Sequence, residues 1–281
     1  MSESRKALGA TLAGGTNNQD RCVIGDGFAA VLDGATSVAG DRSHDPGWYA
    51  EQLAQAIAET VPQGGTLADA ITESIRAVRD THHLTPATTP TSTVALARWS
   101  DEVVETYVLG DSYVVVLQAD GTETVHTDDR LDEVATAERA AYRRRLLDGH
   151  GYDDGHRTHL LELQAEQARR VNQPGGYWIA GAEPEAAQHG ITTIDDHAAA
   201  SALVLASDGV DPLRHPGATT WRDLYEEATM HGPELVLRRI HEAEEADSEG
   251  RQWPRSKPHD DKTLLVVTPC QVDPHGYKRA G

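Results

Sequence analysis

The sequence predicts an α+β fold in which β-sheets are covered by helices. Strand-like apolar runs open the chain, helix-like segments follow, and strand-like runs return towards the end. At 281 residues the chain can form one large domain or two ordinary ones, and 38% hydrophobic residues suffice for a substantial core. With one Phe and two Met, that core must be built from Ala, Val, Leu and Ile.

Local patterns in the first third predict a β-hairpin and two helices. Residues 21–34 hold two apolar runs separated by Gly-Asp-Gly, and Asp-Gly is a typical hairpin turn. In residues 47–60 apolar side chains recur every four positions, which places them on one helical face. A second helix is expected over residues 66–79, with Thr66 as its N-cap and Asp69 three residues further on.

Three strand candidates follow a loop rich in Thr and Pro at residues 82–90. They are residues 91–100, 102–112 and 113–127. Turns are marked by Asp101 and by Asp120-Gly121, so we interpret the three candidates as a meander of antiparallel strands.

The rest of the chain begins with a change of character. Residues 128–159 are charged and helix-like and then rich in Gly and His, which indicates a surface excursion rather than a separate domain. Strand-like runs return at residues 176–181, 201–210 and 262–269, and residues 220–246 are helix-like.

Charge and cysteine content exclude several classes of protein. The formal net charge of −20 argues against a nucleic-acid or anionic-membrane partner, although solubility alone explains an acidic surface equally well. Cys22, expected in a buried strand, and Cys270 cannot form a disulfide framework. The N-terminal segment lacks the apolar stretch of a signal peptide, and no apolar run could span a bilayer. We therefore expect a cytoplasmic protein, and the oligomeric state is left open.

Acidic motifs stand at the ends of strand-like runs that are far apart in sequence. They are NNQDR at 17–21, FAAVLDGATS at 28–37, SALVLASDGV at 201–210 and HDDKTLLVV at 259–267. A folded sheet could bring together their aspartates, Asp20, Asp33, Asp208 and Asp260, and such carboxylates repel one another without a cation. A lone Asp-Gly is more often a plain turn, but two pairs that end apolar runs favour a metal site. The Gly34 carbonyl adds a further oxygen, and oxygen-only ligation favours Mg²⁺ or Mn²⁺.

Other polar and aromatic residues are assigned structural roles. Asp111, in LGDSY, is explained equally well by a turn after a strand. A mobile surface loop explains His150, His156 and His159 better than a transition-metal site does. Trp178 is assigned to core packing rather than to ligand stacking.

The acidic motifs and the strand-like segments between them, taken in sequence order, resemble the metal-dependent protein phosphatases, the type 2C serine/threonine class called PPM. NNQDR resembles that family's Asn-Glu-Asp block, AVLDGAT its strand ending in Asp-Gly, and STVALARW with VLGDSYVVV its Thr-Thr-Ala and Gly-Asp-Ser strands. LVLASDGV is similar to its Ser-Asp-Gly block, and DDKTLLVV to its terminal Asp-Asn-x-Thr strand. The resemblance covers residues 17–267. Each motif alone is weak, but six in sequence order are specific.

The resemblance implies a fold and a domain organisation. The fold is a sandwich of two antiparallel β-sheets flanked by helices, an α-β-β-α arrangement. Residues 1–281 would form a single phosphatase domain of a divergent bacterial type. The charged middle, at roughly residues 128–175, would be a variable flap beside the catalytic cleft.

The resemblance also implies a set of metal ligands. Asp33 would bridge two metal ions, and the Gly34 carbonyl would ligate one of them. Asp208 and Asp260 would complete the shell of the other ion, and Asp20 would act mostly through metal-bound water. Asp33 and Asp208 are accordingly the expected catalytic residues.

Further positions either extend this set or depart from the family pattern. HTDDR resembles the family's Thr-x-Asp-His block, which makes Asp129 a candidate ligand for a third metal, while Asp111 would be structural or would support the metal ligands from behind. Gln19 replaces the family's metal-binding Glu, Gly15 its phosphate-binding Arg, and Ala35 the His that often follows Asp-Gly.

A different cation would have to replace the missing phosphate-binding Arg. Arg21, next to Asp20, is the expected substrate-binding residue. The arginines at residues 143–145 and 169–170 are alternatives, although such runs usually form a solvated helix face.

The implied activity is metal-dependent hydrolysis of phosphomonoesters, with phosphoserine and phosphothreonine in proteins as substrates. Two Mn²⁺ or Mg²⁺ ions, with a third as an option, would activate a bridging hydroxide for in-line attack on phosphorus. No protein nucleophile is then needed, which fits the absence of a Cys-x5-Arg motif. Two alternatives stay open: a phosphatase for a small phosphorylated metabolite, and a degenerate phosphatase-like protein that binds or regulates a partner.

Overall fold

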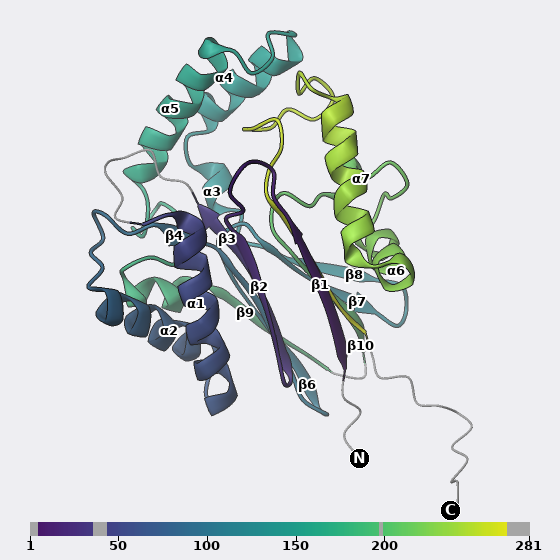
Figure 1. Ribbon diagram of the computed structural model, residues 1–281. Helices are drawn as coiled ribbons and strands as arrows, with labels where there is room; N and C mark the ends of the chain where they lie inside the picture. The colour runs from purple at the N-terminus through teal and green to yellow at the C-terminus, as the bar shows by residue number, and fades with distance from the viewer. Residues whose placement is uncertain (1–4, 36–43, 197–198, 269–281) are drawn as a thin grey trace, which may run out of the picture.

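Two β-sheets pack face to face between two helical layers (Figure 1) in the computed structural model, which describes residues 5–35, 44–196 and 199–268. The first sheet has the strand order β1-β11-β10-β7-β8. The second has the order β2-β3-β5-β6-β9, with β4 paired to β3. The strands of both sheets pair antiparallel. The predicted α+β sandwich flanked by helices is confirmed.

The strands are distributed between the sheets in an order that does not follow the sequence. The first sheet consists of β1 (Lys6–Leu12), β7 (Tyr113–Gln118), β8 (Glu123–His126), β10 (Ala200–Ala206) and β11 (Lys262–Thr268). The second consists of β2 (Asp20–Gly25), β3 (Phe28–Ala35), β4 (Thr91–Ser92), β5 (Val94–Trp99), β6 (Val103–Leu109) and β9 (Ile191–Asp196).

Helices cover the outer face of each sheet. The second sheet is covered by α1 (Pro46–Thr60) and α2 (Leu67–His82), and the first by α6 (Trp221–His231) and α7 (Pro233–Ala246). The other helices are α3 (Arg130–Glu133), α4 (Thr136–Leu147) and α5 (Asp154–Ala168), with the short 3-10 helices η1 (Val61–Gln63), η2 (Pro184–His189) and η3 (Pro212–Arg214). No helix among these described residues has both the length and the apolar character of a membrane span.

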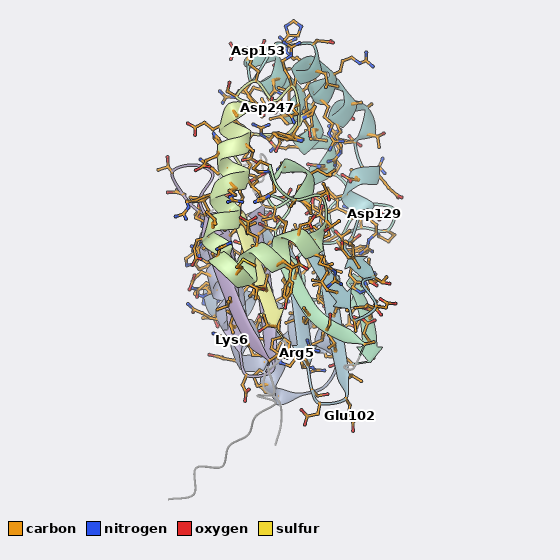
Figure 2. All side chains as sticks on the ribbon, turned by 90° about the vertical axis from the view of Figure 1, so that its right-hand side faces the viewer. Arg5, Lys6, Glu102, Asp129, Asp153 and Asp247 are labelled. Atoms are coloured by element: carbon orange, nitrogen blue, oxygen red, sulfur yellow. The ribbon has the colours of Figure 1, made fainter. Side chains whose placement is uncertain are left out.

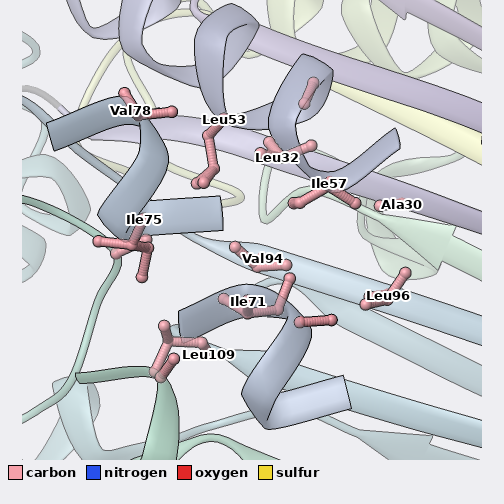
Figure 3. Packing of buried hydrophobic residues seen from close by; sticks show 14 of the residues in the cluster. Ala30, Leu32, Leu53, Ile57, Ile71, Ile75, Val78, Val94, Leu96 and Leu109 are labelled. Atoms are coloured by element: carbon pink, nitrogen blue, oxygen red, sulfur yellow. The ribbon is translucent and has the colours of Figure 1, made fainter. Parts of the chain in front are cut away.

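Both faces of each sheet are buried, which explains why the strands read as continuous apolar runs. In β3, Val31 faces the other sheet, whereas Leu32 packs under α1 and α2 (Figure 3). In β10, Leu205 faces the sandwich interior and Val204 packs against α6 and α7. Successive side chains of a strand point to opposite faces, so each strand contributes to two hydrophobic layers.

The local elements predicted in the first third are present. Gly25 pairs with Phe28, so β2 and β3 are joined by a two-residue turn in which Gly27 has a φ of +75°. The α2 helix begins after Thr66, whose side chain accepts a hydrogen bond from the backbone amide of Asp69. Cys22 lies in β2 as a free, partly buried thiol. Cys270 lies outside the described residues.

The predicted meander of three antiparallel strands is wrong. The β5 and β6 strands pair in the second sheet, whereas β7 and β8 pair in the first. The chain crosses between the sheets at Gly110–Ser112, where Gly110 has a φ of +86° that other residues rarely adopt. The hydrophobic pattern predicted strand content, but it carries no information about which strand each one pairs with.

Two further segments differ from the predictions. Residues 176–181 form isolated bridges instead of a strand. The predicted helix over residues 220–246 is two helices, because Gly232 has a φ of +90° and Pro233 has no amide hydrogen to donate. Trp178 does pack against the core beneath α1 and α2, as expected.

The charged middle of the chain is helical. The α4 and α5 helices project from one end of the sandwich (Figure 1). Their own small core consists of Tyr142, Leu146 and Leu163. His156 lies on α5 and is buried between the rings of Tyr142 and Tyr152, so its predicted place in a surface loop is wrong.

Candidate metal centre

The four predicted aspartates come together at one end of the sandwich. The register of β2 and β3 places Asp20 opposite Asp33. Asp208 follows β10 and Asp260 precedes β11, and these strands are neighbours in the first sheet. The charges of Asp20, Asp208 and Asp260 all act on Asp33. Each sheet therefore contributes two carboxylates to one cluster.

Burial and mutual repulsion favour the protonated forms of these carboxyl groups. Burial raises the pKa of Asp20 to about 7, although hydrogen bonds from neighbouring hydroxyls oppose the rise. Burial and the three other carboxylates raise the pKa of Asp33 well above its usual range. The pKa of Asp208 is also raised, by burial and by Asp260, and its carboxyl group is hydrogen-bonded to that of Asp33. A divalent cation would relieve this repulsion.

The donor atoms fit a hard divalent ion. The Ser207 hydroxyl donates to Oδ2 of Asp20 at 2.6 Å. The other oxygen, Oδ1, is buried and has no hydrogen-bond partner among the described residues. A buried carboxylate oxygen without a partner is costly unless something else binds it. The clustered carboxylates offer only oxygen atoms, a donor type that suits Mg²⁺ or Mn²⁺.

Asp111 lies beside this cluster, whereas its local sequence was explained equally well by a plain turn. Burial raises the pKa of Asp111 to about 7, and the charge of Asp208 adds to the rise. Ser112 shares a 2.6 Å hydrogen bond with Thr93, whose hydroxyl accepts the backbone amide of Asp33 at 3.2 Å. The crossing between β6 and β7 thus positions Asp111 beside the site, and a turn-like Asp gives no local sign of this.

Asp129, predicted as a ligand for a third metal, occupies a different environment. It lies at the start of α3 with its side chain exposed on the outer side of the molecule (Figure 2). Its neighbour Asp128 is buried and accepts a hydrogen bond from Nε of Arg130 at 2.7 Å. A different residue of this segment, Asp132 of α3, contributes through its charge to the raised pKa of Asp111. The role of Asp129 stays a prediction, one that its exposure does not favour.

The two Asp-Gly pairs are points of close packing as well as turns. A Cβ atom on Gly34 would lie 2.8 Å from the carbonyl oxygens of Gln19 and Pro46. A Cβ atom on Gly209 would lie only 2.0 Å from the carbonyl oxygen of Asp261. Because such contacts exclude any side chain, glycine at both positions lets the strand ends approach closely and fixes the preceding aspartates.

Asp261 positions the loop that leads into Asp20. Its Oδ1 accepts the backbone amide of Gly14 at 2.7 Å, and its Oδ2 accepts that of Gln19 at 2.9 Å. Because both oxygens bind backbone amides, Asp261 joins the loop to the start of β11 and is a poor candidate for a metal ligand.

A buried ion-pair network lies beneath the start of β11. The Lys262 ammonium lies 2.6 Å from one Glu244 oxygen, and Arg214 lies 3.1 Å from the other. His241 and His259 stack on each other beside Glu244, and the distances among the three would allow a metal ion. Since both Glu244 oxygens already bind cations, we assign this network a structural role.

Arg21, the predicted substrate-binding cation, is directed towards α1. Its Nε atom donates to Glu51 at 2.6 Å. Its Nη1 atom donates to the carbonyl oxygens of Asn18 and Asp20 at 2.9 and 2.7 Å. These bonds use Nε and Nη1 and stabilise the chain entering β2.

The alternative arginines lie on the projecting helices. Arg145 donates to Asp153 at 2.8 Å, at the tip of the molecule (Figure 2). Arg169 and Arg170 are paired with Glu166 within their own helix turn. These pairs favour the solvated-face interpretation over phosphate binding.

Comparison with known proteins agrees with this architecture. A family model described as protein phosphatase 2C matches residues 10–234. A search of curated proteins found no match. Similar solved structures include the catalytic domain of the serine/threonine phosphatase PstP in complex with two manganese ions, at 16% identity and a TM-score of 0.53. That alignment covers 95% of this chain and 99% of the other.

Two further solved structures extend the likeness. The Ser-Thr phosphatase MsPP from Mycobacterium smegmatis, in complex with cacodylate, is 18% identical, with a TM-score of 0.54 and coverage of 95% and 99%. Stp1 from Staphylococcus aureus is 12% identical, with a TM-score of 0.57 and 94% of both chains covered. At such identities these likenesses establish the fold.

Proposed function

This chain belongs to the protein phosphatase 2C family of metal-dependent serine/threonine phosphatases, and we propose that it removes phosphate from phosphoserine and phosphothreonine in proteins. The observation that carries the proposal is the convergence of Asp20, Asp33, Asp208 and Asp260 from distant segments. Such a surplus of clustered carboxylates has no structural benefit without bound cations.

We assign two Mn²⁺ or Mg²⁺ ions to this cluster. Asp33 would bind both ions, with the Gly34 carbonyl on one side and Asp208 and Asp260 on the other. Asp20 would hold ordered water. Asp111 lies close enough to Asp208 for the two charges to interact. It therefore replaces Asp129 as our preferred candidate for an additional ligand.

The bound ions would supply a water molecule of lowered pKa and a positive field for the phosphoryl oxygens. The chain supplies the geometry. Ser207 fixes Asp20, and Thr93 holds the backbone at Asp33. Hydrolysis adds the hydroxyl group of water to phosphorus and returns the Ser or Thr hydroxyl group to the substrate protein.

The α3–α5 segment is proposed as the flap of a single phosphatase domain. Its position at one end of the sandwich would let it contact a protein substrate (Figure 1). Residues 128–175 would then influence which phosphoproteins are accepted, without taking part in the chemistry.

Asp33→Asn tests the metal-dependent activity. The variant should lose at least about 100-fold of the Mn²⁺-dependent hydrolysis of p-nitrophenyl phosphate and of a phosphothreonine peptide, because direct ligands matter more than the residues that support them. Asp26→Asn, in the exposed hairpin turn, is the matched control and should behave like the wild type. Full activity of Asp33→Asn in the presence of a chelator would refute the proposal.

A second candidate is a phosphatase for small phosphorylated metabolites. Gln19 and Gly15 favour it, because the loop before β2 lacks two charged side chains that the family pattern places there. A panel of phosphopeptides and sugar phosphates separates the candidates by kcat/KM. A protein without turnover on either class, despite bound Mn²⁺, would instead be a phosphatase-like binding protein.

A further inference from the structure

A phosphate ester brings two negative charges to a site that is already rich in carboxylates. Even with two divalent ions bound, a protein cation would help to hold the non-reacting phosphoryl oxygens. Three cationic side chains near the cluster already have acidic or carbonyl partners. Arg21 binds α1, Arg214 binds Glu244, and Lys262 is fully buried between Glu244 and the Asp260 carbonyl.

Lys257 is different from these three. Its ammonium lies 2.6 Å from Oδ1 of Asp260, and 47% of its side-chain surface is exposed. This ion pair directs the ammonium towards the carboxylate cluster, while the exposed part of the side chain stays open to solvent.

Lys257 also lies close to the loop that lacks a cation at Gly15. A Cβ atom on the preceding residue, Gly14, would lie 2.4 Å from the backbone of Asp260, so this loop rests directly on Asp260. A Cβ atom on Gly15 itself would have no neighbour within 4 Å. A side chain at position 15 would therefore extend into open space beside Asp260. Lys257 contacts Asp260 from three residues earlier in the chain.

The backbone around Lys257 is fixed although its side chain is exposed. The buried Arg255 guanidinium donates to the Asp247 carboxylate at 2.8 Å and to the carbonyl oxygen of Pro258 at 2.9 Å. On the other side, His156 of α5 is hydrogen-bonded to the Ser256 carbonyl oxygen at 3.0 Å. The end of α7 and the α5 helix thus both hold the loop, so Lys257 is presented from a fixed backbone.

We propose that Lys257 binds the phosphoryl group of the substrate and takes the place of the cation missing at Gly15. The inference rests on the proposed function, since it requires a phosphate ester at the carboxylate cluster. With metal ions bound to Asp260, the exposed Lys257 side chain would be free to leave that carboxylate and pair with the phosphoryl oxygens of a substrate bound beside it.

The experiment compares Lys257→Gln with Lys257→Arg and with Arg251→Gln, a matched control that removes an exposed cation from the same loop. Calorimetry on the Mn²⁺-loaded proteins measures the Kd of inorganic phosphate, and separately the Kd of Mn²⁺. We expect Lys257→Gln to weaken phosphate binding, and to raise the KM for p-nitrophenyl phosphate, by about 10-fold, the usual effect of one charge-assisted hydrogen bond. The kcat should change little.

Lys257→Arg should retain most phosphate affinity, and Arg251→Gln all of it. Unchanged phosphate affinity in Lys257→Gln overturns the proposal. Tighter Mn²⁺ binding with unchanged phosphate affinity would show that Lys257 only neutralises Asp260. A wild type without Mn²⁺-dependent hydrolysis defeats the proposed function instead, and the phosphate calorimetry then still tests Lys257 by itself.

Discussion

At the scale of single residues, Asp20 and Asp111 connect the electrostatics of the site to stability. Burial raises the pKa of each to about 7. Between about pH 4, where an unfolded Asp ionises, and about pH 7, the folded protein holds protons that the unfolded chain has released. Because the native state binds more protons over this window, its stability must fall as pH rises through it.

The metal-free protein should therefore show a falling Tm between about pH 4 and pH 7. Added Mn²⁺ should raise the Tm more at the higher pH, since ionised carboxylates are the form that binds metal. Asp20→Asn should flatten the pH dependence, and Asp26→Asn should leave it unchanged. Scanning fluorimetry with EDTA or with Mn²⁺ gives both slopes, and a Tm of metal-free wild type that rises over this range would contradict the assignment.

At the scale of elements, the turn after β10 determines whether Asp208 can lie beside Asp260 at the start of β11. Gly209→Ala would place a Cβ atom 2.0 Å from the Asp261 carbonyl oxygen, so the turn must move away from β11. We expect a loss of about 1–3 kcal/mol in the free energy of unfolding, the usual cost of overpacking, together with weaker Mn²⁺ binding. Urea unfolding and calorimetry measure the two effects.

Gly217→Ala is the control for this prediction. A Cβ atom there would meet its nearest neighbour, the His215 ring, at an ordinary 3.7 Å. It should change neither quantity. Equal effects of the two substitutions would mean that glycine is needed for backbone freedom generally and not for contact between the strand ends.

Elements with a complete local signal were predicted from the sequence, and those without one were not. The hairpin turn at Gly27 and the Thr66 cap need only neighbouring residues, so their patterns were sufficient. The β1 and β9 strands were missed because short, mixed sequences such as ITTIDD carry little apolar periodicity. The break at Gly232-Pro233 was visible in the sequence but was outweighed by the helical pattern around it.

At the scale of the whole molecule, the sequence could indicate which aspartates matter but not how the sheets share them. Asp33 and Asp208 followed apolar runs and preceded glycine, which is a readable signal. Asp111 enters the site only because the chain crosses between the sheets, and no local pattern could reveal this. The Lys257–Asp260 ion pair spans only three residues, but its place beside the end of β10 depends on the pairing of β10 with β11.

This division of ligands between the sheets leads to a prediction about cooperativity. Asp20 and Asp33 belong to the second sheet, and Asp208 and Asp260 adjoin the first. Metal ions bound by both pairs would join the sheets at one end, and at about 100 times its Kd a ligand of the folded state adds about 2.7 kcal/mol of stability.

Hydrogen exchange with and without Mn²⁺ should therefore show slower exchange at the site-facing ends of β2 and β3 and also of β10 and β11. Asp33→Asn should reduce the protection in both sheets, because Asp33 is the ligand that both ions would share. Protection limited to one sheet would mean that the ions bind to that sheet alone and that the sandwich is held together only by its apolar interior.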